Sequence, residues 1–381
     1  MTSPQPKPRP KPTPAKARQL RDTTQNVVKT AKVSKSTQPC PKPVPPKDWG
    51  CNKYGTRTGP YYKNKKNKQP MKDYGRWQSM INSGKITETD AKLMLLMSPN
   101  EGDFNSVQAY DDQAITAGAM QKTINTTGEG ELSQQLGDFK KANPGKFKTL
   151  FSDQGWDVDG GDTTDKNGKT VKKRYLAKYS YTDKDGKLVT VKGNELYDFF
   201  KSYCNAKTSK EKKAQIEKAL DSMRQGVEDE DYKDLQVLDF KKRVEEAVGQ
   251  KPVGYDYPIS DYATTAKSQA LVLDQSVNRP AYVDDDYGKA LDDFYKKNPK
   301  APKNPADWGD KRGKYEDEIN ESYGNNRRGT DMANRYKAIK NAADPSIPAD
   351  TVPKPTNVPV TTPPPVVTPP SSGWSFPWPK F

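Results

Sequence analysis

The sequence contains no histidine. This absence excludes Ser-His-Asp and Cys-His catalysis, histidine general bases and histidine metal sites. Carboxylates, tyrosines, lysines and amides remain for any acid–base chemistry, and we expect neither a metal nor a cofactor. Long apolar runs are also missing, since no stretch approaches the roughly 18 apolar residues that a membrane-spanning helix needs. We therefore expect no membrane span.

Hydrophobic residues are scarce and proline is abundant. Of 381 residues only 31% are hydrophobic, whereas 33 are proline, so the whole chain cannot bury a core. The composition predicts one folded body, residues 71–343, between two disordered ends. The first end is a Pro- and Lys-rich arm, residues 1–70, and the second is a Pro-rich tail, residues 344–381.

The excess positive charge lies at one end of the chain. Residues 1–70 hold 17 Lys and Arg against two Asp and Glu, and the rest of the chain holds 47 of each sign. A neutral body argues against a nucleic-acid groove on the folded surface. The arm itself fits a polyanion or a carrier particle, and its lack of an apolar stretch argues against a secretory signal.

Four aromatic residues end the second tail. They are Trp374, Phe376, Trp378 and Phe381. An exposed apolar cluster on a mobile end indicates a docking peptide, or alternatively a contact with the parent body.

Only three cysteines occur, and they do not form a disulfide framework. Cys40 and Cys51 bracket a short Pro-rich stretch, and in an oxidising compartment a disulfide between them would close a small loop. The alternative is that all three cysteines, Cys204 included, are free thiols.

The body has mainly helical periodicity. In the first helix Thr87 is the N-cap, Asp90 completes the capping box and Pro99 marks the end. Further helical spacing covers residues 194–204, 210–227, 232–249, 264–275 and 314–343.

One segment departs from this pattern. Residues 163–193 are β-prone, with Asn167-Gly168 and Asp185-Gly186 as turn pairs, and they predict a two- or three-stranded hairpin among the helices. The same pairs do not fit a calcium loop, because Arg174 or Lys192 falls where a bidentate Glu is needed.

The segment 94–121, MLLMSPNEGDFNSVQAYDDQAITAGAMQ, holds the candidate chemistry. Its apolar helix brings Glu101 to a break made by Pro99 and Gly102. Partial desolvation there would keep a proton on Glu101 near neutral pH, as protonation of a glycosidic oxygen requires. Either Asp111 or Asp112 then serves as the second carboxylate.

Polar and aromatic groups surround these carboxylates in the sequence. Thr116 and Gln121 offer a hydroxyl and an amide that would position water or an N-acetyl group. Tyr110 offers a ring on which a sugar would stack, although ordinary packing accounts for most of the 20 tyrosines.

Together these runs resemble the lysozyme-like superfamily of muramidases, transglycosylases and chitosanases. NEG at 100–102, AYDDQAITAGAMQ at 109–121 and GEGEL at 128–132 follow the layout of that superfamily, and LVLDQSVNRP at 271–280 matches a later run of bacterial muramidase-like domains. Ser276 stands where related domains often carry histidine.

The resemblance implies a mainly α, α+β lysozyme-like fold over residues 75–340. Glu101 would be the acid, Asp111 or Asp112 the assistant, and Thr116 and Gln121 would line the cleft. A later helix end would carry Asp274, Asn278 and Arg279. These residues would either buttress the cleft and contact substrate, or cap the helix and form a buried ion pair that supports the fold.

The expected activity is cleavage of peptidoglycan by a muramidase or a lytic transglycosylase. Such a protein would be made in the cytoplasm and delivered to the wall or periplasm by a particle or a specialised route. The alternative is a non-catalytic cargo or structural component of a phage or contractile injection particle.

Overall fold

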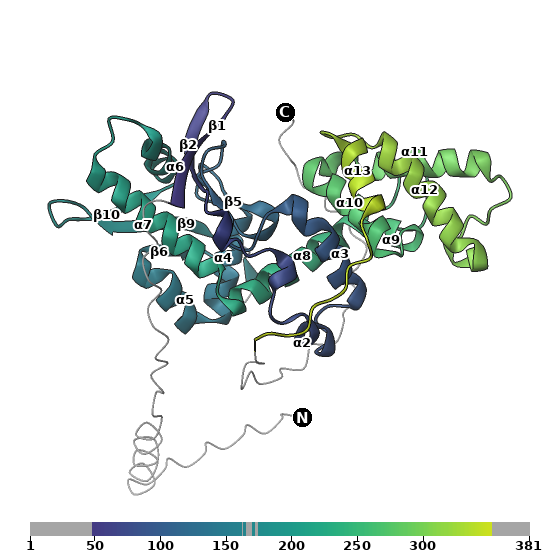
Figure 1. Ribbon diagram of the computed structural model, residues 1–381, viewed down its shortest axis with the longest axis horizontal. Coiled ribbons are helices and arrows are strands. Elements are labelled where there is room, and N and C mark those ends of the chain that lie inside the picture. The colour runs from purple at the N-terminus through teal and green to yellow at the C-terminus, as the bar shows by residue number, and fades with distance from the viewer. Residues whose placement is uncertain (1–47, 162, 165–169, 172–173, 353–381) are drawn as a thin grey trace, which may run out of the picture. The chain divides into compact units, whose positions relative to one another are not determined.

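The computed structural model describes residues 48–352 except 162, 165–169 and 172–173. Helices dominate this part of the chain, and small antiparallel sheets accompany them, so the protein is mainly α with an α+β portion (Figure 1). The helices are α2 (Trp77–Asn82), α3 (Glu88–Glu101), α4 (Glu131–Ala142), α5 (Pro144–Leu150), α6 (Asn194–Lys201), α7 (Lys210–Val227), α8 (Glu230–Val248), α9 (Ile259–Tyr262), α10 (Ala266–Asn278), α11 (Val283–Lys297), α12 (Arg312–Asn326) and α13 (Met332–Asn341).

These bounds confirm the expected helices, with one division. The predicted stretch 314–343 is split at 327–331 into α12 and α13. The periodicity did not indicate five further helices of the described part, which are α2, α4, α5, α9 and α11. Among the described residues, no helix has both the length and the apolar character needed to cross a membrane.

A five-stranded antiparallel sheet precedes α4. Its strands follow chain order, so each pairs with the next: β1 (Trp49–Tyr54), β2 (Arg57–Tyr62), β3 (Val107–Gln108), β4 (Ile115–Ala117) and β5 (Lys122–Ile124). Helices α2 and α3 are inserted between β2 and β3, so the end of α3 leads directly into the sheet.

The predicted hairpin is confirmed in a second sheet. Strands β9 (Leu176–Thr182) and β10 (Leu188–Lys192) are joined by a turn in which Gly186 has φ +78°, and β6 (Trp156–Asp159) is the third strand. The short pair β7 (Thr163–Thr164) and β8 (Thr170–Val171) stands apart. The turn pair Asn167-Gly168 lies outside the described residues.

Two hydrophobic clusters form the interior, and α8 belongs to both. Its Tyr232 packs with α4–α7 and the sheets, whereas Val237, Phe240 and Val244 pack with α2, α3 and α9–α13. All four side chains are essentially buried. Figure 1 shows α8 between the two groups of elements.

Helix α3 begins as expected and ends later than expected. The Thr87 hydroxyl accepts from the Asp90 N–H, and the Asp90 carboxylate accepts from the Thr87 N–H, which completes the capping box. Pro99 does not end the helix, which continues to Glu101. Gly102, with φ +89°, follows as the residue that stops it.

The folded body extends beyond the predicted residues 71–343 at its N-terminal side. Strands β1 and β2 lie within the predicted arm 1–70, yet they pair with each other, and β2 also pairs with β3. Trp49 is 3% exposed, and its indole Nε1 donates to Asp221 Oδ1 at 2.9 Å. The buried tryptophan anchors a hairpin that the basic composition concealed; residues 1–47 lie outside the described part.

Both alternatives for the cysteines are wrong for Cys51, which is neither bridged to Cys40 nor a free thiol. Cys51 on β1 is disulfide-bonded to Cys204, across a sequence separation of 153 residues. The strand pairing places Cys51 beside the turn that follows α6, whereas proximity in sequence had favoured Cys40. Cys40 lies outside the described residues.

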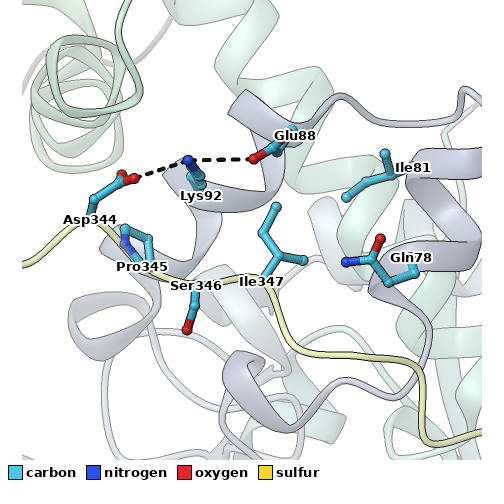
Figure 2. A pocket seen from close by; sticks show the side chains of 8 residues that line it. All are labelled: Gln78, Ile81, Glu88, Lys92, Asp344, Pro345, Ser346 and Ile347. Atoms are coloured by element: carbon cyan, nitrogen blue, oxygen red, sulfur yellow. Dashed lines mark hydrogen bonds and ion pairs between the residues drawn. The ribbon is translucent and has the colours of Figure 1, made fainter.

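The C-terminal side also extends beyond residue 343. Residues 344–352, which we call the strap, run along α2 and α3 (Figure 2). The Asp350 carboxylate accepts from the N–H groups of Gln78 and Ser79 at 2.7 and 2.9 Å, and so caps α2. The Thr351 N–H donates to the Gly75 carbonyl at 3.0 Å. The aromatic residues Trp374, Phe376, Trp378 and Phe381 lie outside the described residues.

Candidate functional site

Glu101 is the last residue of α3, at the point where the chain enters the sheet. Its side chain lies outside what the structure describes, but the backbone that follows is placed. A Cβ added at Gly102 would lie 3.4 Å from Ser106 Oγ and 3.5 Å from Gln121 Cγ. The end of α3 therefore lies against Gln121, which the sequence had paired with Glu101 in one site.

Gln108 and Thr116 face each other across two strands. They are register partners on β3 and β4, and partners in an antiparallel pair project to the same face. Thr116 is only 3% exposed. The Gln108 amide reaches Gln121 Oε1 at 3.4 Å.

Asp111 lies in the loop that joins these strands. Its carboxylate accepts from the Gln113 N–H at 3.0 Å, and from Gln108 Nε2 and Thr116 Oγ1 at 3.4 Å each. We call Gln108, Asp111, Thr116 and Gln121 the polar cluster. Three of its four members are residues that the sequence had singled out.

Asp112 does not join the polar cluster. It is exposed, and its described hydrogen bond is to the side chain of the adjacent Gln113, at 2.9 Å. Of the two aspartates, Asp111 is the one with described contacts to Thr116 and Gln108.

A strained turn presents Gln121. Met120 and Gln121 have φ of +63° and +49°, values that cost a non-glycine residue about 1–3 kcal/mol and that cluster at functional sites. The buried Gln236 of α8 supports the turn: its Oε1 accepts from the Ala119 N–H at 2.7 Å, and its Nε2 donates to the Val227 carbonyl at 2.9 Å.

Tyr110 contributes to packing between the hairpin and the loop. Its ring meets Tyr61 of β2 edge to face, with centroids 6.3 Å apart. Burial raises the pKa of the Tyr110 hydroxyl, and the nearby Asp111 charge adds to that effect. These contacts correspond to the packing alternative for this tyrosine.

Lys201, at the end of α6, also reaches the loop. Its Nζ donates to the Ala109 carbonyl at 2.5 Å and to the Gln113 carbonyl at 2.9 Å. Burial lowers the pKa of Lys201 to about 8, against the attraction of Asp111. Neither Lys201 nor Gln108 stood out in the sequence, because Lys201 follows the loop by some 90 residues and Gln108 belongs to no recognisable motif.

Asp274 supports the fold. It is fully buried in α10, where its carboxylate pairs with Arg327 Nη2 at 2.8 Å and with Arg335. Asn278 and Arg279 are exposed at the end of the same helix. Asn278 Nδ2 donates to the Asp274 carbonyl and the Arg279 N–H donates to the Gln275 carbonyl, both on that helix, while the Arg279 carbonyl accepts from the Tyr282 N–H. The buried ion pair matches the alternative in which this run supports the fold.

A hollow of about 460 Å³ lies elsewhere, where the strap crosses α2 and α3. In Figure 2 the Lys92 ammonium lies between the carboxylates of Asp344 and Glu88. The hollow is lined by Gln78, Ile81, Glu88, Lys92, Asp344, Pro345, Ser346 and Ile347, none of which belongs to the polar cluster. Within the described ranges, no group of three or more cysteines and carboxylates is placed to hold a metal ion.

Comparison of the chain with protein-family models, with curated proteins and with solved structures finds no match.

Proposed function

We propose that this protein cleaves a glycan of the peptidoglycan type, with Glu101 as the general acid and Asp111 as the second carboxylate. The observation that carries the proposal is the polar cluster: Gln108 links the Asp111 carboxylate to Gln121, and Gln121 lies against the backbone at the end of α3. A helix that ends in an acid and leads into a small sheet bearing a second carboxylate is the layout that the lysozyme-like resemblance implies.

The proposed chemistry divides the work between two carboxylates. Glu101 donates a proton to the glycosidic oxygen, and Asp111 holds a water or stabilises the positively charged transition state on the sugar. Thr116 and Gln108 hold the Asp111 carboxylate toward the sheet face, and Gln121 contributes an amide for the substrate. No step needs a histidine, a metal or a cofactor.

The test is digestion of purified peptidoglycan by the full chain, with mass analysis of the released fragments. Glu101→Gln and Asp111→Asn are each expected to lower fragment release by about a hundredfold or more, because each removes one of two groups that act as a unit. Asp112→Asn is the matched control and keeps the parental rate. Parental activity in Glu101→Gln would refute the proposal.

The fragment masses separate the two reactions within this proposal. A muramidase adds water across the bond, whereas a lytic transglycosylase leaves a 1,6-anhydro end that is lighter by one water. If the parent releases no fragments under any condition, the non-catalytic cargo role is favoured instead. Deletion of residues 1–47 and of residues 353–381 tests the polyanion and docking roles of the two ends, and leaves the described hairpin and strap in place.

A further inference from the structure

The Lys201 side chain closes the loop that bears Asp111. Its ammonium bonds to the carbonyl oxygens of Ala109 and Gln113, which flank residues 110–112 on either side. A single cation thus fixes the distance between the two ends of the loop. Bonds from a charged donor are about twice as strong as neutral ones.

The hairpin holds the first end of the same loop. The Ala109 N–H donates to the Pro60 carbonyl of β2 at 2.8 Å. A Cβ added at Gly59 would lie 2.0 Å from the Ala109 carbonyl oxygen, which is the atom that accepts from Lys201. Only a glycine permits this approach, so Ala109 is held from both sides.

The disulfide links the same hairpin covalently to the end of α6. Cys51 is the register partner of Pro60, and its bond to Cys204 ties the hairpin to the turn Ser202–Cys204, which follows α6 at once. Lys201 and Cys204 are therefore only three residues apart, and together they connect the end of α6 to the loop and to the hairpin.

We propose that Lys201 is a positioning residue for Asp111: its ammonium, held by the end of α6, fixes the loop so that the Asp111 carboxylate meets Thr116 and Gln108. The catalytic part of this inference rests on the proposed function of Asp111. The positioning part concerns loop geometry and can be measured without substrate.

The charges that face Lys201 come from two elements. Asp111 and Asp112 attract its ammonium from the loop, and Arg57 of β2 repels it. On its own helix, the Tyr197 ring centroid lies 4.5 Å from Nζ, a cation–π contact. No carboxylate oxygen is among the described hydrogen-bond acceptors of Nζ, so its donors serve the loop backbone.

The experiment compares the parent with Lys201→Met and Lys201→Arg in the full chain. In Lys201→Met we expect hydrogen exchange to rise by about tenfold or more at the amides of Ala109, Gln113 and Ala114, whose acceptors are described. We expect kcat on peptidoglycan to fall by about ten- to a hundredfold with KM nearly unchanged. Lys201→Arg keeps the charge and two donors and restores part of both. Lys207→Met, which alters an exposed lysine nearby, is the matched control.

Parental loop exchange in Lys201→Met overturns the positioning role. A parent that cleaves no peptidoglycan overturns the proposed function, and loop exchange then decides by itself whether Lys201 positions the loop. A fall in kcat without any change in loop exchange also counts against positioning, because the effect then bypasses the loop.

Discussion

Gly59 and Ala109 approach so closely that a methyl group on Gly59 would lie 2.0 Å from the Ala109 carbonyl oxygen. We expect Gly59→Ala to push the hairpin away from the Asp111 loop and to lower the free energy of unfolding by about 1–3 kcal/mol, as overpacking does. Urea unfolding measures this loss. Gly313→Ala is the control, since nothing lies within 4 Å of a Cβ there. Equal stability of Gly59→Ala and the parent would contradict the close approach.

Removal of the disulfide is expected to destabilise the oxidised protein. Cys51→Ser or Cys204→Ser opens a covalent loop of 153 residues, and loss of a native disulfide costs about 2–5 kcal/mol. Unfolding midpoints in urea, with and without a thiol reductant, measure the effect, and the reductant should lower the midpoint of the parent but not those of these two variants. Cys40→Ser is the control and keeps both the midpoint and the response to reductant. A Cys51→Ser midpoint that matches the parental one argues against the Cys51–Cys204 pairing.

Asp350, although distant in sequence, caps the N-terminus of α2. Asp350→Ala leaves the N–H groups of Gln78 and Ser79 without their acceptor, and loss of a helix cap costs about 1 kcal/mol. A thermal melt should show a lower Tm for this variant. Asp344→Asn, which alters an exposed ion pair with Lys92 on the same strap, should change the Tm little. Equal shifts in the two variants would mean that the cap makes no special contribution.

Asp221 makes stability depend on pH. Burial raises its pKa to about 6, against the hydrogen bond from Trp49 Nε1, so the folded protein binds this proton more tightly than the unfolded chain does. The contribution is therefore fully present below about pH 4 and is lost as the pH rises through 6. Asp221→Asn keeps an acceptor for Trp49 without the charge, and should exceed the parent in stability by up to about 3 kcal/mol at pH 7 and by little at pH 4. Urea midpoints across this range measure the difference, and a constant difference at all pH values would rule out this titration.

Local signals in the sequence predicted local structure well. The capping box of Thr87 and Asp90, and the turn at Asp185-Gly186, each depend on residues within a few positions of one another. Pro99 misled the prediction because a proline near the end of a helix forfeits an N–H bond yet need not stop the helix. Gly102 stops α3 instead.

Long-range contacts explain what the sequence did not reveal. Trp49 finds its partner Asp221 and Cys51 finds Cys204 only after the chain has folded, so a basic, Pro-rich composition concealed the hairpin. The same holds for Lys201, whose bonds to the loop are backbone contacts with no sequence signature. The choice of Asp111 over Asp112 depends on strand register, which spacing alone does not fix.

The sharing of α8 between the two hydrophobic clusters determines how the described body comes apart. Tyr232 is buried in one cluster and Phe240 in the other, only two helical turns away, and Gln236 between them holds the strained turn of Gln121. Loss of packing in either cluster weakens α8 for the other, so we expect the two clusters of the described body to unfold together. A change among α9–α13, far from the candidate site, thus acts on Gln121 through a single helix.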